Sequence, residues 1–246
     1  MHLPRSGRRM NKTAIAFGTF DGVHRGHQEI INAMLTAAEG RGLDPLIYTF
    51  SNHPAGLFGK SFSMIMTDGE RLAALERFAP VAAERLDRQF AATEPEDFVR
   101  HMAEKYRMGA AIAGFNYTFG SRGAGNMDTL CRLGGKYGFE VYEIPALMYG
   151  GEPVSSTRIR ACIERGDIAG ANAMLGHELE LSCKETSQNG HAVLKVADGL
   201  VLPAPGRYIT EAEGRRLVCG VLPGGSIEPE EPLRGIKKLR FIGRIG

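Results

Sequence analysis

Short apolar runs alternate with amphipathic helical patterns through most of this chain, and this alternation limits the fold more than any other feature. Strand-like runs of four to eight residues fit buried strands, whereas the longer segments repeat apolar residues at helical spacing. The predicted strands are residues 13–20, 44–50, 109–115 and 139–145, and the predicted helices are residues 27–42, 67–78, 95–108 and 127–138. Such alternation over residues 13 to 178 predicts an α/β fold with a Rossmann-like parallel sheet.

The pattern changes near residue 179. Beyond it, β-prone runs are broken by "SQNG", "DG" and "PAPG", and the longest helical pattern is "TEAEGRRL" at residues 210–217. We therefore predict a flexible leader over residues 1–12, an α/β domain over 13–179 and a small, mostly β appendage over 180–246. So short a segment is marginal for a core of its own, and we expect it to lean on the first domain or on a partner chain.

Composition excludes several classes of function. The 246 residues carry 30 Lys+Arg against 28 Asp+Glu, which leaves no broad basic face for nucleic acid. No apolar stretch is long enough for a membrane span. The four cysteines form no CxxC pair and no metal-ligand spacing, so we expect a reduced, cytoplasmic protein without a protein-bound metal. The sequence leaves a homo-oligomer open.

The stretch "GTFDGVHRGHQEII", residues 18–31, places two histidines among three glycines directly before a helical pattern. A helix that begins near His24 to His27 points free backbone N–H groups and about half a positive charge toward the end of the preceding strand. Gly18, Gly22 and Gly26 allow close approach of a ligand. His24 and His27 share one helical face and can donate hydrogen bonds to phosphate, although a solvated surface turn is the alternative.

Three further strand ends carry residues of the same chemistry. "VSSTRIR" places hydroxyl groups at a predicted helix start, with Arg160 three residues after Thr157 and therefore on the same face. "GFNYTFGSRGAGN" offers Asn116 and three alternating aromatic residues, and "TFSNHP" offers His53. Each segment alone fits an ordinary capped helix or a loop. Their joint occurrence at strand ends favours a nucleotide-phosphate site.

Taken together, "GTFDGVHRGH", "TFSNHP", "GFNYTFG", "SSTRIR" and "GDIAGANAMLG" resemble the adenylyltransferase module of prokaryotic bifunctional riboflavin kinase/FAD synthetase, within the HxGH nucleotidyltransferase superfamily. The resemblance covers residues 13 to 178, in order. It implies a Rossmann-like fold that transfers AMP from ATP to FMN with Mg²⁺, giving FAD and pyrophosphate.

The resemblance also implies roles for individual residues. The catalytic set would be His24, His27, Asn116 and Arg160. The ATP-binding set would be Gly18, Phe20, Gly26, Ser156, Thr157 and Arg158. His53, Tyr117 and Phe119 would bind FMN. Because the FMN phosphate is already an anion, the reaction needs charge neutralisation and in-line positioning rather than an activated nucleophile.

The sequence departs from the family in two places. Ser51 and Asn52 stand where an acidic residue and proline are common, at the flavin end. Residues 180–246 lack the glycine-rich run ending in P-T-A-N of the kinase module, and only "LVLPAPGRY" is similar to it. We therefore expect FMN adenylyltransferase activity without riboflavin kinase activity. Two alternatives stay open: a nucleotidyltransferase for another phosphorylated acceptor, and a non-catalytic flavin- or nucleotide-binding protein.

Overall fold

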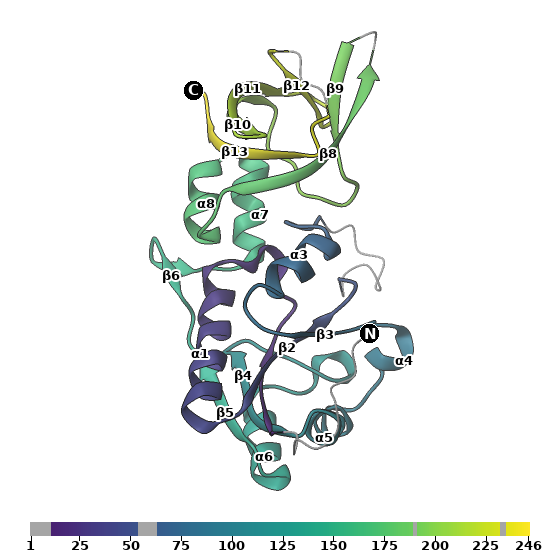
Figure 1. The fold of residues 1–246 in the computed structure, drawn as a ribbon, viewed down its shortest axis with the longest axis vertical. Coiled ribbons are helices and arrows are strands. Elements are labelled where there is room, and N and C mark those ends of the chain that lie inside the picture. Colours follow the sequence, from purple (N-terminus) through teal and green to yellow (C-terminus); the bar gives the residue numbers. More distant parts are fainter. Residues whose placement is uncertain (1–10, 54–62, 189–190, 232–234) are drawn as a thin grey trace. The chain divides into compact units, whose positions relative to one another are not determined.

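The computed structural model describes residues 11–53, 63–188, 191–231 and 235–246 (Figure 1). Most of the predicted leader, residues 1–10, lies outside this part of the chain. The chain divides into two compact units. The first comprises Met1–Gly18, Ile30–Thr49 and Phe78–Pro145, and the second comprises Thr19–Glu29, Phe50–Arg77 and Ala146–Gly246. Each unit is assembled from three separate stretches of the chain. The predicted domain boundary at residue 179 stays a prediction.

A five-stranded sheet forms the centre of the first unit, in the order β3-β2-β1-β4-β5. The strands are β1 (Thr13–Phe17), β2 (Asp44–Phe50), β3 (Val81–Glu84), β4 (Met108–Gly114) and β5 (Glu140–Ile144). Strand β1 pairs in parallel with β2 and β4, and β4 pairs in parallel with β5. Strands β1 and β4 are buried over most of their length, which explains their largely apolar sequences. The predicted parallel α/β fold is confirmed.

The helices between these strands match the four predicted helices to within three residues at each end, but the sequence did not predict the short helix at residues 88–91 or the strand at residues 81–84. They are α1 (Arg25–Arg41), α3 (Asp68–Leu75), α4 (Arg88–Ala91), α5 (Pro95–Lys105) and α6 (Met127–Tyr137), with 3₁₀ turns at η1 (Asp21–Val23) and η2 (Ser121–Gly123). Thr67 and Glu70 form a capping box at the start of α3, in which each side chain bonds the backbone of the other residue. Asn126 caps α6, and Gly138 ends it in the left-handed conformation.

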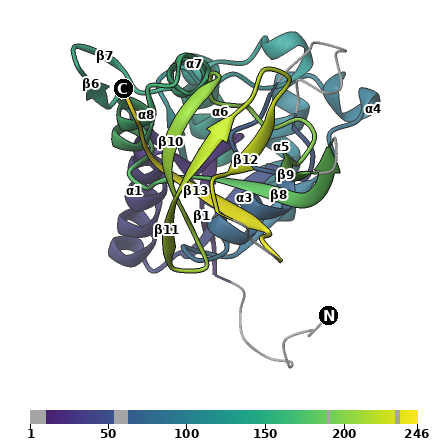
Figure 2. The ribbon, with the colours of Figure 1, turned by 90° about the horizontal axis from the view of Figure 1, so that it is seen from above.

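From residue 146 onward, the second unit consists of a short hairpin, two helices and a closed barrel. Helices α7 (Ser156–Arg165) and α8 (Ile168–Leu175) follow a short hairpin of β6 (Met148–Tyr149) and β7 (Glu152–Pro153). The barrel has the strand order β10-β11-β12-β9-β8-β13 (Figure 2). Its strands are β8 (Leu179–Gln188), β9 (His191–Val196), β10 (Gly206–Ala212), β11 (Arg215–Val221), β12 (Ser226–Pro229) and β13 (Lys238–Arg244).

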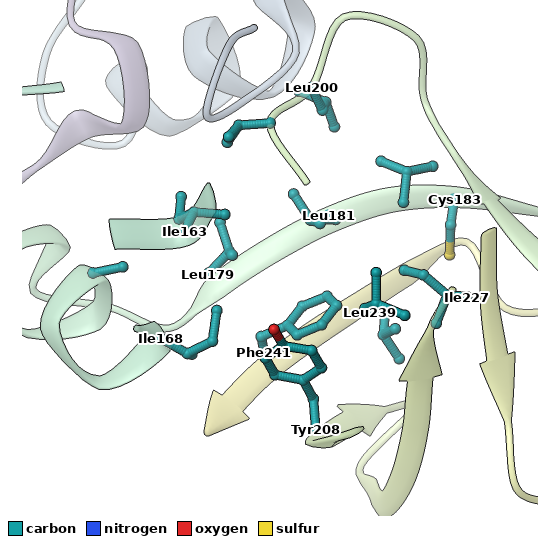
Figure 3. Close-up of a cluster of buried hydrophobic side chains, with 14 of the residues drawn as sticks. Ile163, Ile168, Leu179, Leu181, Cys183, Leu200, Tyr208, Ile227, Leu239 and Phe241 are labelled. Atoms are coloured by element: carbon teal, nitrogen blue, oxygen red, sulfur yellow. The ribbon is translucent and has the colours of Figure 1, made fainter. Parts of the chain in front are cut away.

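One hydrophobic cluster joins the barrel interior to α7 and α8. Ile163 and Ile168 from these helices belong to the same buried cluster as Leu179, Tyr208 and Phe241 of the barrel (Figure 3). The Tyr208 and Phe241 rings meet edge to face with centroids 5.5 Å apart. The small β appendage therefore shares its core with the two helices that precede it, as its size led us to expect.

The helical pattern of "TEAEGRRL" does not form a helix. These residues form the end of β10, a two-residue turn and the start of β11. Glu213 and Gly214 have φ values of 48° and 74°, which match the type I′ turn of a tight hairpin. In the described part of the chain, no helix combines the length and apolar composition that crossing a membrane would need.

Candidate active site

The loop between β1 and α1, residues 19–23, has an unusual backbone. Phe20 and Val23 adopt φ values of 56° and 41°, although neither is glycine, and Gly22 has φ 78°. Such values are costly for a bulky or β-branched residue, so surrounding contacts must hold them. Phe20 is fully buried, with its ring 5.3 Å from the His27 ring and edge-on to it. We call residues 19–23 the histidine loop because they lead directly to His24.

Side chains from three elements hold the carbonyl groups of the histidine loop. The buried Arg71 guanidinium of α3 donates to the Thr19 carbonyl at 3.1 Å. The Ser156 hydroxyl at the start of α7 donates to the Asp21 carbonyl at 3.0 Å. The His177 ring, just after α8, lies with Nε2 3.0 Å from the Gly22 carbonyl oxygen. A strained segment is thus fixed from several sides, which is the condition for a preorganised site.

His24 and His27 stack on one another at the start of α1. Their ring centroids are 3.5 Å apart and their planes differ by 16°. The backbone N–H of His27 donates to the ring Nδ1 of His24 at 3.3 Å. A neutral His24 therefore carries its proton on Nε2 and offers an N–H donor there. Gly26 leaves room for this arrangement, because a Cβ on Gly26 would stand 3.3 Å from two atoms of the His24 ring.

Burial keeps both imidazoles neutral. Desolvation lowers the pKa of His24 to about 4, and the positive charge of Arg160 adds to the effect. Burial likewise lowers the pKa of His27 well below its ordinary value, with further lowering by His24 and Arg71. His53 behaves similarly: desolvation, then Arg71 and Arg160, lower its pKa to about 4. The site therefore offers neutral N–H donors within an electropositive environment, which suits an anionic ligand.

Asp21 connects the histidine loop to α7. Its buried carboxylate forms an ion pair with Arg160, with Nη1 and Oδ2 2.8 Å apart. Desolvation raises the pKa of the Asp21 carboxyl, against the opposing effects of backbone hydrogen bonds and of Arg160. Arg160 also donates to the Thr157 hydroxyl at 3.2 Å, as their predicted three-residue spacing requires. Thus Asp21 orients the guanidinium that the resemblance assigns to the phosphates.

Helix α7 begins where the sequence predicts a helix N-terminus, but Arg158 makes contacts other than the predicted one with ATP. Ser155 is the cap residue and accepts from the Arg158 N–H at 3.3 Å. Arg158 itself turns to the β6–β7 hairpin, where it donates to the Tyr149 and Glu152 carbonyls at 2.7 and 3.0 Å. These contacts lend no support to Arg158 as an ATP ligand, and that assignment stays a prediction.

The predicted flavin residues divide between the two compact units. Phe119, in the first unit, is buried against the rings of Phe98 and Tyr117, and a Cβ on Gly125 would lie only 2.6 Å from it. Burial raises the pKa of the Tyr117 hydroxyl. Phe115 is by contrast 47% exposed. Within this loop, Phe119 has the contacts of a packing residue, and Phe115 is the aromatic side chain that a ligand can reach.

The described part of the chain forms no protein cage for a metal ion. Among them, no group of three His, Cys, Asp or Glu side chains is placed to hold a metal ion. Asp21 is the buried carboxylate of the histidine loop, but its oxygens already accept from Arg160 and from the Ile65 N–H. Mg²⁺ commonly binds through substrate phosphates and one or two carboxylates, so binding of Mg²⁺ does not require three protein ligands.

Comparison with known proteins identifies the family. The family model described as FAD synthetase matches residues 7–158, more than half of the chain. The chain belongs to the FAD synthetase family. That match takes in the histidine loop, both histidines and the start of α7. It confirms the resemblance that the sequence motifs carry.

Curated relatives of the FAD synthetase family cover the chain to different extents. The bifunctional riboflavin kinase/FMN adenylyltransferase of Bacillus subtilis is 31% identical over 171 residues, which are 67% of this chain and 54% of that protein. The FAD synthetase of Listeria monocytogenes is 29% identical and covers 80% of each chain. The chain thus spans about half the length of the bifunctional relatives it matches.

A solved structure extends the likeness to the barrel. A crystal structure described as a macrolide-efflux protein from Streptococcus pneumoniae matches with a TM-score of 0.81 and 25% identity. The match covers 95% of this chain and 85% of that one. Combining the α/β part with a C-terminal barrel is therefore not peculiar to this FAD synthetase family member.

Most of the site residues predicted from the sequence lie in the second unit. Three further residues that hold the histidine loop or Arg160 were not predicted. His24, His27, Ser156, Thr157 and Arg160 come together there with Phe20, Gly26 and His53, whereas Gly18 and Asn116 belong to the first unit. Asp21, Arg71 and His177 were not predicted as site residues. Asp21 lies within the recognised motif and could have been found; Arg71 and His177 gave no local signal.

Proposed function

We propose that this protein is an FMN adenylyltransferase that transfers AMP from ATP to FMN, giving FAD and pyrophosphate. The observation that carries the proposal is the stacked, neutral His24–His27 pair beside the Asp21–Arg160 ion pair, in a chain of the FAD synthetase family. Its N–H donors and guanidinium match a reaction that concentrates negative charge on phosphoryl oxygens.

The chain's own groups would each act on a phosphate. An oxygen of the FMN phosphate attacks the α-phosphorus of ATP, and the bond from that phosphorus to the bridging oxygen of pyrophosphate breaks. No proton has to be removed from the nucleophile, so buried neutral histidines serve as donors rather than as bases. His24 and His27 stabilise the oxygens of the transferring phosphoryl group, while Arg160 and Thr157 hold the departing pyrophosphate.

Mg²⁺ would neutralise phosphate charge when it is bound with ATP. Ser156 is already committed to the Asp21 carbonyl, and we propose that it shapes the site rather than contacting substrate. Asn116 and the exposed Phe115 are our candidates for binding FMN, whereas Tyr117 and Phe119 stack on one another. Since both substrates are small intracellular metabolites, we place the reaction in the cytoplasm.

We further propose that the barrel has no riboflavin kinase activity. Phosphorylating a ribityl hydroxyl requires a base that accepts the hydroxyl proton and a second Mg·ATP site. The barrel sequence lacks the P-T-A-N element, and its interior is filled by apolar side chains such as Leu181, Ile227 and Leu239 (Figure 3).

One assay tests both parts of the proposal. The purified chain is incubated with Mg·ATP and either FMN or riboflavin, and products are separated by chromatography. We expect FAD and pyrophosphate from FMN, and no FMN from riboflavin. Adenylation of another phosphorylated acceptor, but not of FMN, would favour a related nucleotidyltransferase. Tight flavin or nucleotide binding without any product would indicate a binding protein.

A further inference from the structure

A short segment, residues 64–66, lies between the barrel and the histidine loop within the second compact unit. On one side it pairs with the barrel connection that joins β9 to β10. The Met64 N–H donates to the Gly199 carbonyl at 2.7 Å, and the Val201 N–H donates to the Met64 carbonyl at 2.8 Å. Met64 and Leu200 thereby form an isolated parallel bridge. We call residues 64–66 the connecting segment.

On its other side the connecting segment holds Asp21. The Ile65 and Met66 N–H groups donate to one oxygen of the Asp21 carboxylate, at 3.0 and 3.4 Å. The Ile65 side chain is buried, and a Cβ on Gly22 would stand 3.0 Å from its tip. Backbone and side chain of the same residue therefore contact the histidine loop. Ile65 is also part of the hydrophobic cluster that fills the barrel.

The remaining oxygen of Asp21 carries the connection to α7. It accepts from Arg160 Nη1 at 2.8 Å, and Arg160 Nη2 donates to Thr157. The position of the guanidinium thus depends on a carboxylate whose own position depends on two backbone N–H groups. Those N–H groups belong to a segment that is hydrogen-bonded to the barrel. Every contact from the barrel connection to Arg160 is a backbone or charge-assisted hydrogen bond.

A second, parallel connection passes through α3. Glu70 completes the capping box of α3 and also accepts from the Ser182 hydroxyl of β8 at 2.7 Å. Lys238 of β13 lies 3.2 Å from the same carboxylate. The next residue, Arg71, donates to the Thr19 carbonyl of the histidine loop. Two independent sets of contacts therefore lead from barrel strands or their connections to this loop.

We propose that the barrel positions the adenylyl-transfer site, with Asp21 as the positioning residue and residues 64–66 as the link. The inference rests on the proposed function, because it assigns Arg160 to the departing pyrophosphate. It gives the barrel a task that requires no kinase chemistry: the barrel fixes one edge of the connecting segment, and this fixes the Asp21–Arg160 pair. The grouping of residues 19–29 and 50–77 with the barrel in one compact unit supports this assignment.

The test is a double-mutant cycle between the barrel connection and Arg160. Val201→Pro removes the N–H that donates to Met64, and Arg160→Lys removes the planar fork that pairs with Asp21. Val201→Pro should lower kcat for FAD formation several-fold, and by no more than the about 10-fold expected of Arg160→Lys, because it acts through the position of Arg160; the KM for ATP should change less. The effects of the two changes on kcat should be non-additive: the kcat of the double variant should lie within about 2-fold of the kcat of Arg160→Lys alone.

Two matched controls separate this link from general damage to the barrel. Leu222→Pro removes an N–H that donates to the Ser226 carbonyl at 2.8 Å, in another barrel turn. Its effect on kcat should be small, and any loss should add to that of Arg160→Lys. Val201→Ala keeps the N–H and trims the buried side chain, so it should lower the melting temperature but retain kcat.

If Val201→Pro does not fold, Met64→Pro replaces it, because that change removes the Gly199 hydrogen bond from the connecting segment and leaves the barrel sequence intact. Additive losses, or an unchanged kcat in both proline variants, would overturn the inference. If the unaltered protein forms no FAD at all, the proposed function fails instead. The same cycle is then measured on the affinity for inorganic pyrophosphate by calorimetry, where coupling supports the positioning role and additivity overturns it.

Discussion

The histidine loop and the barrel belong to the same compact unit, yet they are stabilised in opposite ways. The loop combines left-handed backbone at Phe20 and Val23 with buried polar groups that depend on Arg71, Ser156 and connecting-segment amides. The barrel has an apolar interior, and its charged groups pair along the outside. Backbone strain and buried charge are thus concentrated in the histidine loop, where we propose phosphate chemistry, whereas apolar packing in the barrel stabilises the fold.

Removing a core ring from the barrel should give the largest effect, and it should appear as lost stability. Phe241 is fully buried against Tyr208. Phe241→Ala should destabilise the protein by about 3–5 kcal/mol, measured by chemical or thermal unfolding. Ile209→Ala is the control on a neighbouring strand, since Ile209 is 39% exposed and should cost far less. Equal losses at both positions would contradict the barrel core described above.

Removing an imidazole from the site should affect turnover instead. His24→Ala and His27→Ala should each lower kcat for FAD formation about 10²-fold to 10³-fold, the range found when a preorganised transition-state donor is lost. The KM for ATP should move less, and the unfolding midpoint should change less than in Phe241→Ala. Steady-state kinetics and a thermal melt measure the two quantities. Near-normal kcat in both variants would refute the phosphate-site interpretation.

Acid should destabilise the site region before it affects the barrel. The pKa of His24 is about 6.5 when unfolded and about 4 in the folded protein, so the unfolded chain binds the extra proton first. Stability is therefore highest above pH 6.5 and falls as pH drops from about 6.5 toward 4, by an amount on the order of 2–3 kcal/mol. Unfolding free energies measured across this range should show the decline. His24→Gln should make the decline shallower, with His27 and His53 accounting for what is left. An unchanged slope would argue against a buried neutral His24.

Changing the shape of a cation without changing its charge should have an intermediate effect. Arg160→Lys keeps the charge beside Asp21 but loses the fork that also reaches Thr157, so kcat should fall about 10-fold. Arg165 lies farther along α7, and its guanidinium bonds Cys162 Sγ. Arg165→Lys should leave kcat within about 2-fold. Equal tolerance at the two positions would make "SSTRIR" merely a capped helix start.

The smallest effect is expected on the barrel surface. Arg207 donates to Glu230 through two nitrogens, but both side chains are largely exposed. Arg207→Gln should change the free energy of unfolding by less than about 1 kcal/mol and leave kcat unaltered. A larger loss, measured by the same chemical unfolding, would show that surface ion pairs carry more of the barrel's stability than its apolar core implies.

Much of the fold and part of the site could be predicted because their signals are local. The alternation of apolar runs and helical patterns predicts a parallel sheet, and the hydroxyl groups of "VSSTRIR" predict the start of α7. The motif around His24 and His27 predicts the anion site and the family. Closure of residues 179–244 into a barrel could not be predicted, because it depends on pairing of β8 with β13 across more than fifty residues. The hairpin at "TEAEGRRL" is by contrast local, since Ala212 pairs with Arg215 across the Glu213–Gly214 turn.

By itself, then, the sequence determined the strand and helix pattern, the helix caps and the residue types that suit phosphate, since these depend on neighbours a few residues apart. Only the tertiary structure decided which buried groups hold the site: Arg71 on the Thr19 carbonyl, the Ile65 amide on Asp21, and Asp21 on Arg160. These contacts join residues 44 to 139 positions apart in the chain. Burial and charge pairing at such separations arise only from packing, and no local pattern in the chain encodes them.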